Sequence, residues 1–265
     1  MAGSITLIGA GRMGMAMASG WLEDKNRPSV EIVDPSVGDL VAGWADAGTI
    51  TLNPAPAPAD VLVIAVKPQI FQNASSDIAA RVGPETLVVS VMAGIDLAGL
   101  EAALGSRNLV RVMPNTPGAI GRGVALFSAA DSVAPAALDR VKALLAPLGR
   151  VEGPMSETDL VKATAVSGCG PAYVFLLAEL MANAGAARGL DPELSARIAR
   201  ATVEGAAALM AGSDQTPEAL RQAVTSPGGV TKAALDVLMA PDAAPSLFET
   251  AFAAAEQRDK ELSGS

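Results

Sequence analysis

Hydrophobic residues follow two different patterns along this chain, and the change falls near residue 153. Before it, short apolar runs alternate with longer stretches of mixed character. After it, apolar residues recur at the spacing of helices. Short, wholly apolar runs are typical of strands in a parallel sheet that is covered on both faces. The pattern predicts an α/β domain over residues 1–153 and an all-α domain over residues 154–265.

Each predicted strand of the first half ends in small, polar or proline residues, such as Lys67-Pro68 and Ala93-Gly94. In open α/β sheets, ligands lie outside the carboxyl ends of the strands. The segments that follow the strands are therefore expected to form a binding site. The predicted strands cover residues 4–8, 30–33, 61–66, 87–92, 109–113 and 149–152.

A glycine motif directly follows the first predicted strand. Gly9-Ala10-Gly11-Arg12-Met13-Gly14 precedes a helical pattern over residues 15–23, and the second strand ends on Asp34, 20 residues after the last glycine. In a dinucleotide-binding fold the first glycine makes the turn and the second lets the pyrophosphate approach backbone N–H groups. The third allows close packing of helix and strand. This order of elements predicts a Rossmann domain.

Asp34 bears on the choice of dinucleotide. A carboxylate there accepts hydrogen bonds from the adenosine ribose and repels a 2′-phosphate. None of the next five residues is Lys or Arg, although Arg12 could still face a phosphate. The residues favour NADH and leave NADPH open.

The second half consists of helical patterns with small faces, such as Ala206-Ala207-Ala208. Half of all residues are apolar, but only 3% are aromatic. Because a small helical domain cannot bury so much apolar surface alone, we expect an intertwined dimer. A monomeric helical bundle is the alternative. The predicted helices cover residues 157–167, 171–188, 191–212, 216–225, 230–239 and 245–262.

A glycine-rich turn, Ser226-Pro227-Gly228-Gly229, precedes the predicted helix over residues 230–239. Free N–H groups and the positive end of the helix dipole gather at such a start, and glycines leave it open. The turn therefore suits a small carboxylate. The alternative is an ordinary loop whose helix is capped by Thr231.

Composition excludes several classes of function. A net charge of −9 argues against nucleic acid. With Cys169 as the one cysteine and no histidine, we expect no disulfide and no metal site. The longest apolar stretch, residues 172–190, is interrupted by Glu179 and Arg188, and a motif starting at residue 9 leaves no room for a signal peptide. We expect a soluble, cytoplasmic protein without membrane association.

Together the two halves resemble pyrroline-5-carboxylate reductase, the enzyme family of the last step of proline biosynthesis. The resemblance covers essentially the whole chain, and its most specific parts are the last two of the motifs that carry it. These motifs are residues 8–14 (IGAGRMG), 65–68 (AVKP), 113–117 (MPNTP), 167–173 (SGCGPAY) and 226–231 (SPGGVT).

The resemblance implies reduction of 1-pyrroline-5-carboxylate to L-proline with NADPH or NADH. It also implies an interlocked homodimer that can assemble further, up to a decamer. The substrate would lie between the nicotinamide and the glycine-rich turn, with the Thr231 hydroxyl as the catalytic group near the ring nitrogen. Its carboxylate would be held by Ser226, Gly228, Gly229, Val230 and Thr231. Together with the glycine motif and Asp34, the resemblance assigns cofactor binding to Ile8, Gly9, Ala10, Gly11, Arg12, Met13, Gly14, Asp34, Asn53, Ala65, Val66, Lys67, Pro68, Met92 and Ala93.

The chemistry agrees with the absence of histidine. An iminium substrate already carries the charge that makes its carbon electrophilic, so hydride transfer needs positioning more than a strong acid. Three positions depart from the family pattern: Asp34 stands where Ser or Thr is common, Lys162 where an acidic or neutral residue is expected, and Cys169 where Ser is frequent.

Two other functions compete with this interpretation. A two-domain hydroxyacid dehydrogenase could use Lys162 as the acid of an alcohol/ketone couple. A dinucleotide-binding sensor without catalysis would bind NADH and reduce no imine.

Overall fold

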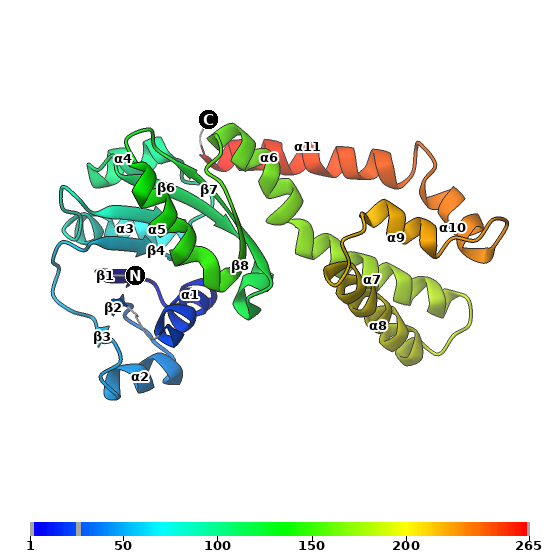
Figure 1. Ribbon diagram of the computed structural model, residues 1–265, viewed down its shortest axis with the longest axis horizontal. Helices are drawn as coiled ribbons and strands as arrows, with labels where there is room; N and C mark the ends of the chain where they lie inside the picture. Colours follow the sequence, from blue (N-terminus) through cyan, green and yellow to red (C-terminus); the bar gives the residue numbers. More distant parts are fainter. Residues whose placement is uncertain (1–2, 25–27, 264–265) are drawn as a thin grey trace. The chain divides into compact units, whose positions relative to one another are not determined.

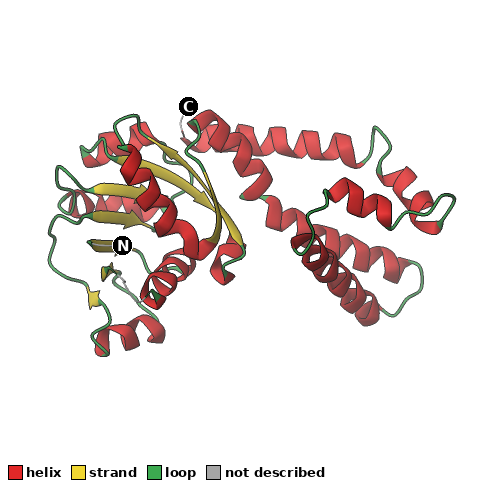
Figure 2. Ribbon diagram, in the orientation of Figure 1, coloured by secondary structure: helices red, strands yellow, loops and turns green. Residues whose placement is uncertain are grey.

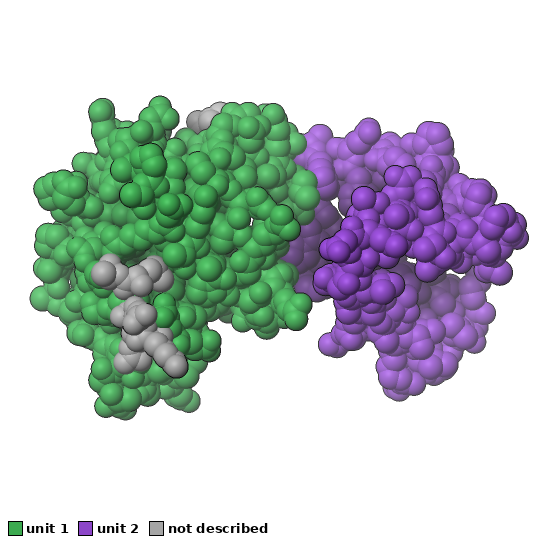
Figure 3. Space-filling model, in the orientation of Figure 1, with its two compact units in different colours: residues 1–168, 256–265 green, residues 169–255 purple. Residues whose placement is uncertain are grey.

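The computed structural model describes residues 3–24 and 28–263 (Figure 1). The strands of this part of the chain gather in one region, and the rest is helical (Figure 2). By its contacts the chain divides into two compact units, a first unit of residues 1–168 and 256–265 and a second unit of residues 169–255 (Figure 3).

The first unit is built on one eight-stranded sheet with the order β3-β2-β1-β4-β5-β6-β7-β8. All neighbouring strands pair in parallel except β6 and β7, which are antiparallel. The first six strands have the doubly wound order of dinucleotide-binding folds, which confirms the predicted Rossmann domain. The strands are β1 (Ser4–Ile8), β2 (Ser29–Val33), β3 (Thr51–Leu52), β4 (Val61–Ile64), β5 (Leu87–Ser90), β6 (Leu109–Pro114), β7 (Gly123–Ala129) and β8 (Gly149–Glu152).

Helices cover both faces of this sheet, as β4 shows. Val61 and Val63 point into a core shared with α1 and α5, whereas Leu62 and Ile64 point into a core shared with α3 and α4. All four side chains are buried, and this is why the strand reads as a continuous apolar run. The helices of the first unit are α1 (Arg12–Glu23), α2 (Asp39–Asp46), α3 (Pro68–Ala79), α4 (Leu97–Leu104), α5 (Pro135–Leu145) and α6 (Glu157–Ser167).

The strands and helices differ from the predicted ones in a few places. Strand β7 was not predicted; it forms an antiparallel pair with β6 after a short 3-10 turn over Thr116–Ile120. Helix α1 begins at Arg12, within the glycine motif. Strands β4 and β5 each end two residues early, so Ala65 and Met92 lie in the loops that follow.

In the second unit, helices α7 and α8 pack closely against each other. Gly185 leaves room for this contact, since a Cβ atom there would collide with the hydroxyl of Ser195. That hydroxyl donates to the Ala182 carbonyl at 2.7 Å. Tyr173 of α7 stacks on Phe252 of α11 with ring centroids 5.8 Å apart. The remaining helices are α7 (Gly170–Ala187), α8 (Pro192–Ala211), α9 (Pro217–Ala223), α10 (Val230–Leu238) and α11 (Ala244–Ser263).

The contacts place α6 in the first unit, although the sequence puts it after the predicted domain boundary at residue 153. Leu160 of α6 is fully buried against Met113 and Leu126 of the sheet. The last turns of α11, from Glu256 onward, also belong to the first unit. A division of the chain into domains 1–153 and 154–265 remains a prediction, while the compact units separate after Gly168.

The stretch Glu157–Ala187 is long and apolar enough to cross a bilayer by length and composition, and little of it is buried. It is not one straight helix, because α6 ends at Ser167 and α7 begins at Gly170. Several large side chains of α7 are exposed, among them Phe175, Leu177 and Leu180. The second unit of a single chain therefore presents an extensive apolar surface.

Candidate active site

The glycine motif forms a tight loop between β1 and α1. Gly9 has φ +98°, a conformation that favours glycine, and its N–H donates to the Val33 carbonyl at 2.9 Å. A Cβ atom at Gly14 would collide with the Gly9 carbonyl oxygen. At Gly11, by contrast, no atom lies within 4 Å of a built Cβ position. The loop is thus closed on the protein side at Gly9 and Gly14 and open at Gly11.

The start of α1 has the properties of an anion site. Its N-cap residue is Gly11, no side chain caps it, and its first turn contains no acidic residue. The first helical bond to Gly11 comes from the N–H of Met15 at 2.8 Å. None of the hydrogen bonds found among residues 3–24 and 28–263 uses the N–H groups of Arg12, Met13 or Gly14. These groups and the helix dipole suit a pyrophosphate.

Asp34 lies at the carboxyl end of β2, and hydrogen bonds fix its carboxylate. One oxygen, Oδ2, accepts the N–H of Ala10 in the glycine loop at 2.8 Å, and the other, Oδ1, accepts the N–H of Ser36 at 2.8 Å. Asn53 holds the main chain of Asp34 from the other side: its Oδ1 accepts the Asp34 N–H at 2.9 Å, and its Nδ2 donates to the Asp34 carbonyl at 3.0 Å. Asn53 has φ +49°, in the left-handed region that asparagine tolerates.

The loops after β4 and β5 complete this edge of the sheet. Lys67 is exposed at the N-cap of α3, with Pro68 in the first turn. Ala93 is exposed, but the side chain of Met92 is buried in the core at 2% exposure. Met92 therefore presents only its main chain at this edge. The structure brings together at the carboxyl ends of the strands the residues that were predicted to bind the cofactor.

Asn115, within the motif of residues 113–117, connects three elements of the first unit. It follows β6, its Oδ1 accepts the Val124 N–H of β7 at 2.9 Å, and its Nδ2 donates to the Ser167 carbonyl at the end of α6 at 3.0 Å. The side chain thus fixes the point at which the chain leaves the first unit.

A buried ion cluster lies beside the β5–α4 loop, and the sequence analysis missed it. Arg111 of β6 is 2% exposed and contacts Glu157 Oε1 at 3.2 Å and Asp259 Oδ2 at 3.5 Å. Glu157 also accepts the N–H of Leu97 at 3.1 Å. A signal was present, because a cation inside the apolar strand Leu-Val-Arg-Val-Met requires a buried partner.

The predicted substrate loop lies in the second unit, at the start of α10. Gly228 has φ +67°, and Gly229 is the N-cap, without a side-chain cap. A Cβ atom at Gly229 would collide with the Ser226 hydroxyl. Thr231 lies within the helix and Gly229 is its N-cap, so the part of the alternative in which Thr231 caps the helix is wrong.

The N–H groups of this loop differ from the prediction in one respect. The Gly229 N–H donates to the Ser226 carbonyl at 3.0 Å and so closes the turn. Those of Val230, Thr231 and Lys232 appear in no hydrogen bond among the residues that the structure describes. The available donors are thus the first N–H groups of α10, and both Val230 and Thr231 are exposed.

Two cations that the sequence analysis did not assign lie next to this loop. A cavity of about 450 Å³ in the second unit is lined by Arg221, Thr225, Pro227 and Lys232, among others. Lys232 pairs with Asp236, and Arg221 lies 3.9 Å from Glu218. Each of the two cations thus has a neighbouring carboxylate, so these four side chains together bring no net positive charge to the loop.

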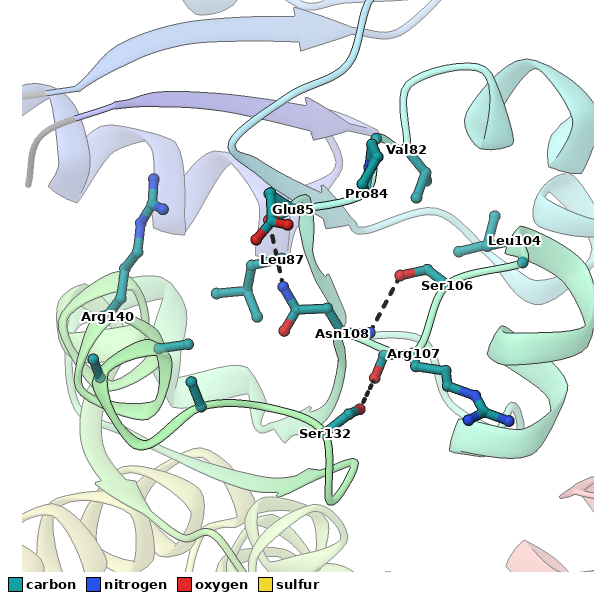
Figure 4. Close-up of a pocket in the computed structure, with 15 residues that line it drawn as sticks. Val82, Pro84, Glu85, Leu87, Leu104, Ser106, Arg107, Asn108, Ser132 and Arg140 are labelled. Atoms are coloured by element: carbon teal, nitrogen blue, oxygen red, sulfur yellow. Dashed lines mark hydrogen bonds between the residues drawn. The ribbon is translucent and has the colours of Figure 1, made fainter.

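A further cavity, of about 840 Å³, lies elsewhere in the first unit (Figure 4). It is formed by the loops that precede β5 and β6 and by the segment after β7, with Glu85, Asn108 and Arg140 among its lining residues. These loops are at the opposite edge of the sheet from the glycine motif. The cavity is therefore separate from the predicted cofactor site.

Comparisons with known proteins match both halves of the chain. Residues 157–262 match the family model described as pyrroline-5-carboxylate reductase dimerisation, and residues 4–94 match that described as NADP oxidoreductase coenzyme F420-dependent. Pyrroline-5-carboxylate reductase of Pseudomonas aeruginosa is 38% identical over 97% of this chain and 96% of that protein.

Solved structures agree with this match. That of a pyrroline-5-carboxylate reductase from Coxiella burnetii has a TM-score of 0.87 at 32% identity, covering 98% of each chain. The Plasmodium falciparum pyrroline carboxylate reductase, solved with NADP bound, has a TM-score of 0.78 at 29% identity, again over 98% of each chain.

Proposed function

The chain belongs to the pyrroline-5-carboxylate reductase family, and from this membership we propose that it reduces 1-pyrroline-5-carboxylate to L-proline with NADH or NADPH. The observation that carries the proposal is that one chain contains two helix starts that suit anions. One is the open glycine loop at α1, and the other is the uncapped, glycine-led start of α10. A dinucleotide and a small carboxylate are the ligands that these two sites suit.

The residues at the edge of the sheet fit a dinucleotide. The open position at Gly11 and the unbonded N–H groups at the start of α1 would hold the pyrophosphate, and Asp34 would face the adenosine ribose. Lys67, Pro68 and Ala93 would line the nicotinamide half. When bound, the reduced nicotinamide supplies the hydride.

The glycine-led start of α10 would bind the carboxylate of the imine through the N–H groups of Val230 and Thr231. Gly228 and Gly229 shape the turn and leave the approach of the substrate open. The Ser226 carbonyl closes the turn by accepting the Gly229 N–H. The Thr231 hydroxyl oxygen would accept a hydrogen bond from the ring N–H of the protonated imine, whereas it could donate only to the nitrogen of the neutral imine. Because the protonated imine is already electrophilic, these residues act chiefly by positioning the substrate and by electrostatics.

The exposed apolar side chains of α7 support association between copies of this chain. The match to the dimerisation family model over residues 157–262 supports the same association. We propose that the second unit buries Phe175, Leu177 and Leu180 in a homodimer, that dimers assemble further up to a decamer, and that the enzyme is cytoplasmic. Light scattering of the purified protein measures the assembly, and a monomer would contradict it.

The activity is tested by following the loss of reduced-nicotinamide absorbance with 1-pyrroline-5-carboxylate. Thr231→Ala should lower kcat by one to two decades, at about 1.4 kcal/mol per decade, and Thr231→Ser should retain most of the rate because it keeps the hydroxyl. A folded Thr231→Ala variant with unchanged kcat would refute the proposed role of the hydroxyl. Failure of the native protein to oxidise either cofactor would refute the proposed reaction.

A further inference from the structure

We infer that this enzyme discriminates against the 2′-phosphate of NADPH and prefers NADH, and that the carboxylate of Asp34 is the residue that decides. The inference rests on the proposed function only for its catalytic assay. Its basis is the hydrogen-bonded geometry of Asp34 in the first unit.

The carboxylate of Asp34 is held in position before any ligand arrives. Backbone N–H groups of Ala10 and Ser36 each bind one of its oxygens at 2.8 Å, and Asn53 fixes its main chain through two further bonds. The side chain cannot rotate away from a ligand without breaking both of its carboxylate hydrogen bonds, and the main chain that carries it is fixed as well. A phosphate placed beside it would therefore meet a fixed negative charge.

The remaining lone pairs of the carboxylate suit a ribose. An ionised carboxylate has about four acceptor positions, and the two backbone N–H groups occupy two of them. Ribose hydroxyls can donate to the others, whereas a phosphate dianion has no proton to donate. The bond to Ala10 also attaches the carboxylate to the glycine loop itself, so it lies next to the predicted pyrophosphate site.

The charges around Asp34 do not compensate for it. The segment from Pro35 to Asp39 contains no Lys or Arg and adds a second carboxylate at Asp39. Arg12 is exposed at the start of α1 and is the nearest cation in the glycine motif. Its place beside the unbonded N–H groups suits the pyrophosphate, which both dinucleotides share. Arg12 therefore gives no preference for the 2′-phosphate.

The test compares kcat/KM for NADH and NADPH at saturating imine. The native enzyme should favour NADH by about tenfold or more, and Asp34→Ser should reduce this ratio by about tenfold or more. Asp34→Asn, which keeps one acceptor oxygen, should reduce it as well and serves if Asp34→Ser fails to fold. Asp39→Ser removes the same charge from the exposed first turn of α2 and should change the ratio by less than about twofold, which separates position from net charge.

A native preference for NADPH, or an unchanged ratio in folded Asp34 variants, would overturn the inference. Calorimetric dissociation constants for the two dinucleotides, measured without imine, keep it separate from the proposed reaction. If neither cofactor is oxidised but NADH binds more tightly than NADPH in the native protein and not in Asp34→Ser, the reaction is refuted and the inference stands.

Discussion

Gly11 and Gly14 lie three residues apart in one loop, yet their substitution by alanine should impair different properties of the protein. At Gly14 the new Cβ would collide with the Gly9 carbonyl oxygen and lie 3.4 Å from a methyl group of Leu7. At Gly11 it would meet nothing within 4 Å, and the backbone, with φ −69° and ψ −178°, is accessible to alanine. Gly14→Ala should therefore impair folding, and Gly11→Ala should impair binding.

The magnitudes follow from these contacts. Forcing a methyl group against a backbone carbonyl is overpacking, which costs about 1–3 kcal/mol of unfolding free energy, so the Tm of Gly14→Ala should fall by several degrees. For Gly11→Ala, the loss of a favourable N-cap glycine and the lower entropy of the unfolded chain roughly offset each other at about 0.5–1 kcal/mol each. Its Tm should stay close to that of the native protein.

The binding loss of Gly11→Ala arises because its methyl group would occupy the space that the pyrophosphate needs. An overlap that costs about 1–3 kcal/mol weakens NADH binding by about 5- to 150-fold. Calorimetric titration with NADH and thermal unfolding without cofactor, run on both variants, measure the two effects separately. Normal NADH affinity in Gly11→Ala would refute the placement of the pyrophosphate at this loop, and an unchanged Tm in Gly14→Ala would refute the packing argument.

Three further variants test other parts of the chain. Arg111→Met leaves Glu157 and Asp259 without the cation that they share, and it should lower the free energy of unfolding by about 3 kcal/mol, measured by urea denaturation. If adding E157Q and D259N to R111M restores none of the lost stability, the ionic explanation fails. Lys162→Met should leave imine reduction nearly unchanged, since the lysine is 60% exposed and its ion pair is with an exposed Asp159. A hydroxyacid dehydrogenase that uses this acid would instead lose its turnover. The pKa of Asp60 is lowered below its ordinary value of 3.8 by the backbone N–H of Ser4 and then by the Ser4 hydroxyl. The stability that this carboxylate contributes is therefore present above pH 3.8 and is lost as the pH falls through the lowered pKa. The loss of stability with falling pH below 3.8 should be shallower in Asp60→Asn, and identical slopes in the two proteins would contradict this.

The sequence predicted those strands and helices whose own residues carry a clear pattern, either wholly apolar or at helical spacing. Strand β4 is apolar throughout because both faces are covered. Helix α6 was predicted with its observed ends from its helical pattern, and in the structure Ser156 caps its start. Strand β7 was missed: Gly123, Ala125 and Ala129 weaken its apolar signal, and its pairing with β6 depends on a neighbour that only the fold supplies.

The spacing of residues along the chain predicted which side chains lie at the carboxyl ends of the strands, but not how they are hydrogen-bonded. The glycine spacing and Asp34 located the dinucleotide edge from local signals. That the carboxylate of Asp34 is bonded to Ala10, and its main chain to Asn53, depends on residues up to 24 positions apart. For the same reason the Gly229 N–H was predicted as a substrate donor although the turn already uses it. Spacing along the chain identifies candidate donors, and only the folded backbone shows which of them are free.

The helical unit is an insertion within the first unit rather than an appendage to it. The chain leaves the first unit after Gly168 and rejoins it at Glu256. A fragment cut at residue 168 would keep every strand of the sheet but lose Asp259, a partner of the buried Arg111, and Leu262, which lies against Gly94 in the loop after β5. Deleting the last ten residues should accordingly damage the nucleotide-binding part of the molecule first. For anyone engineering this protein, the C-terminus is a component of the Rossmann fold, and the residues that can be exchanged as a block are 169–255.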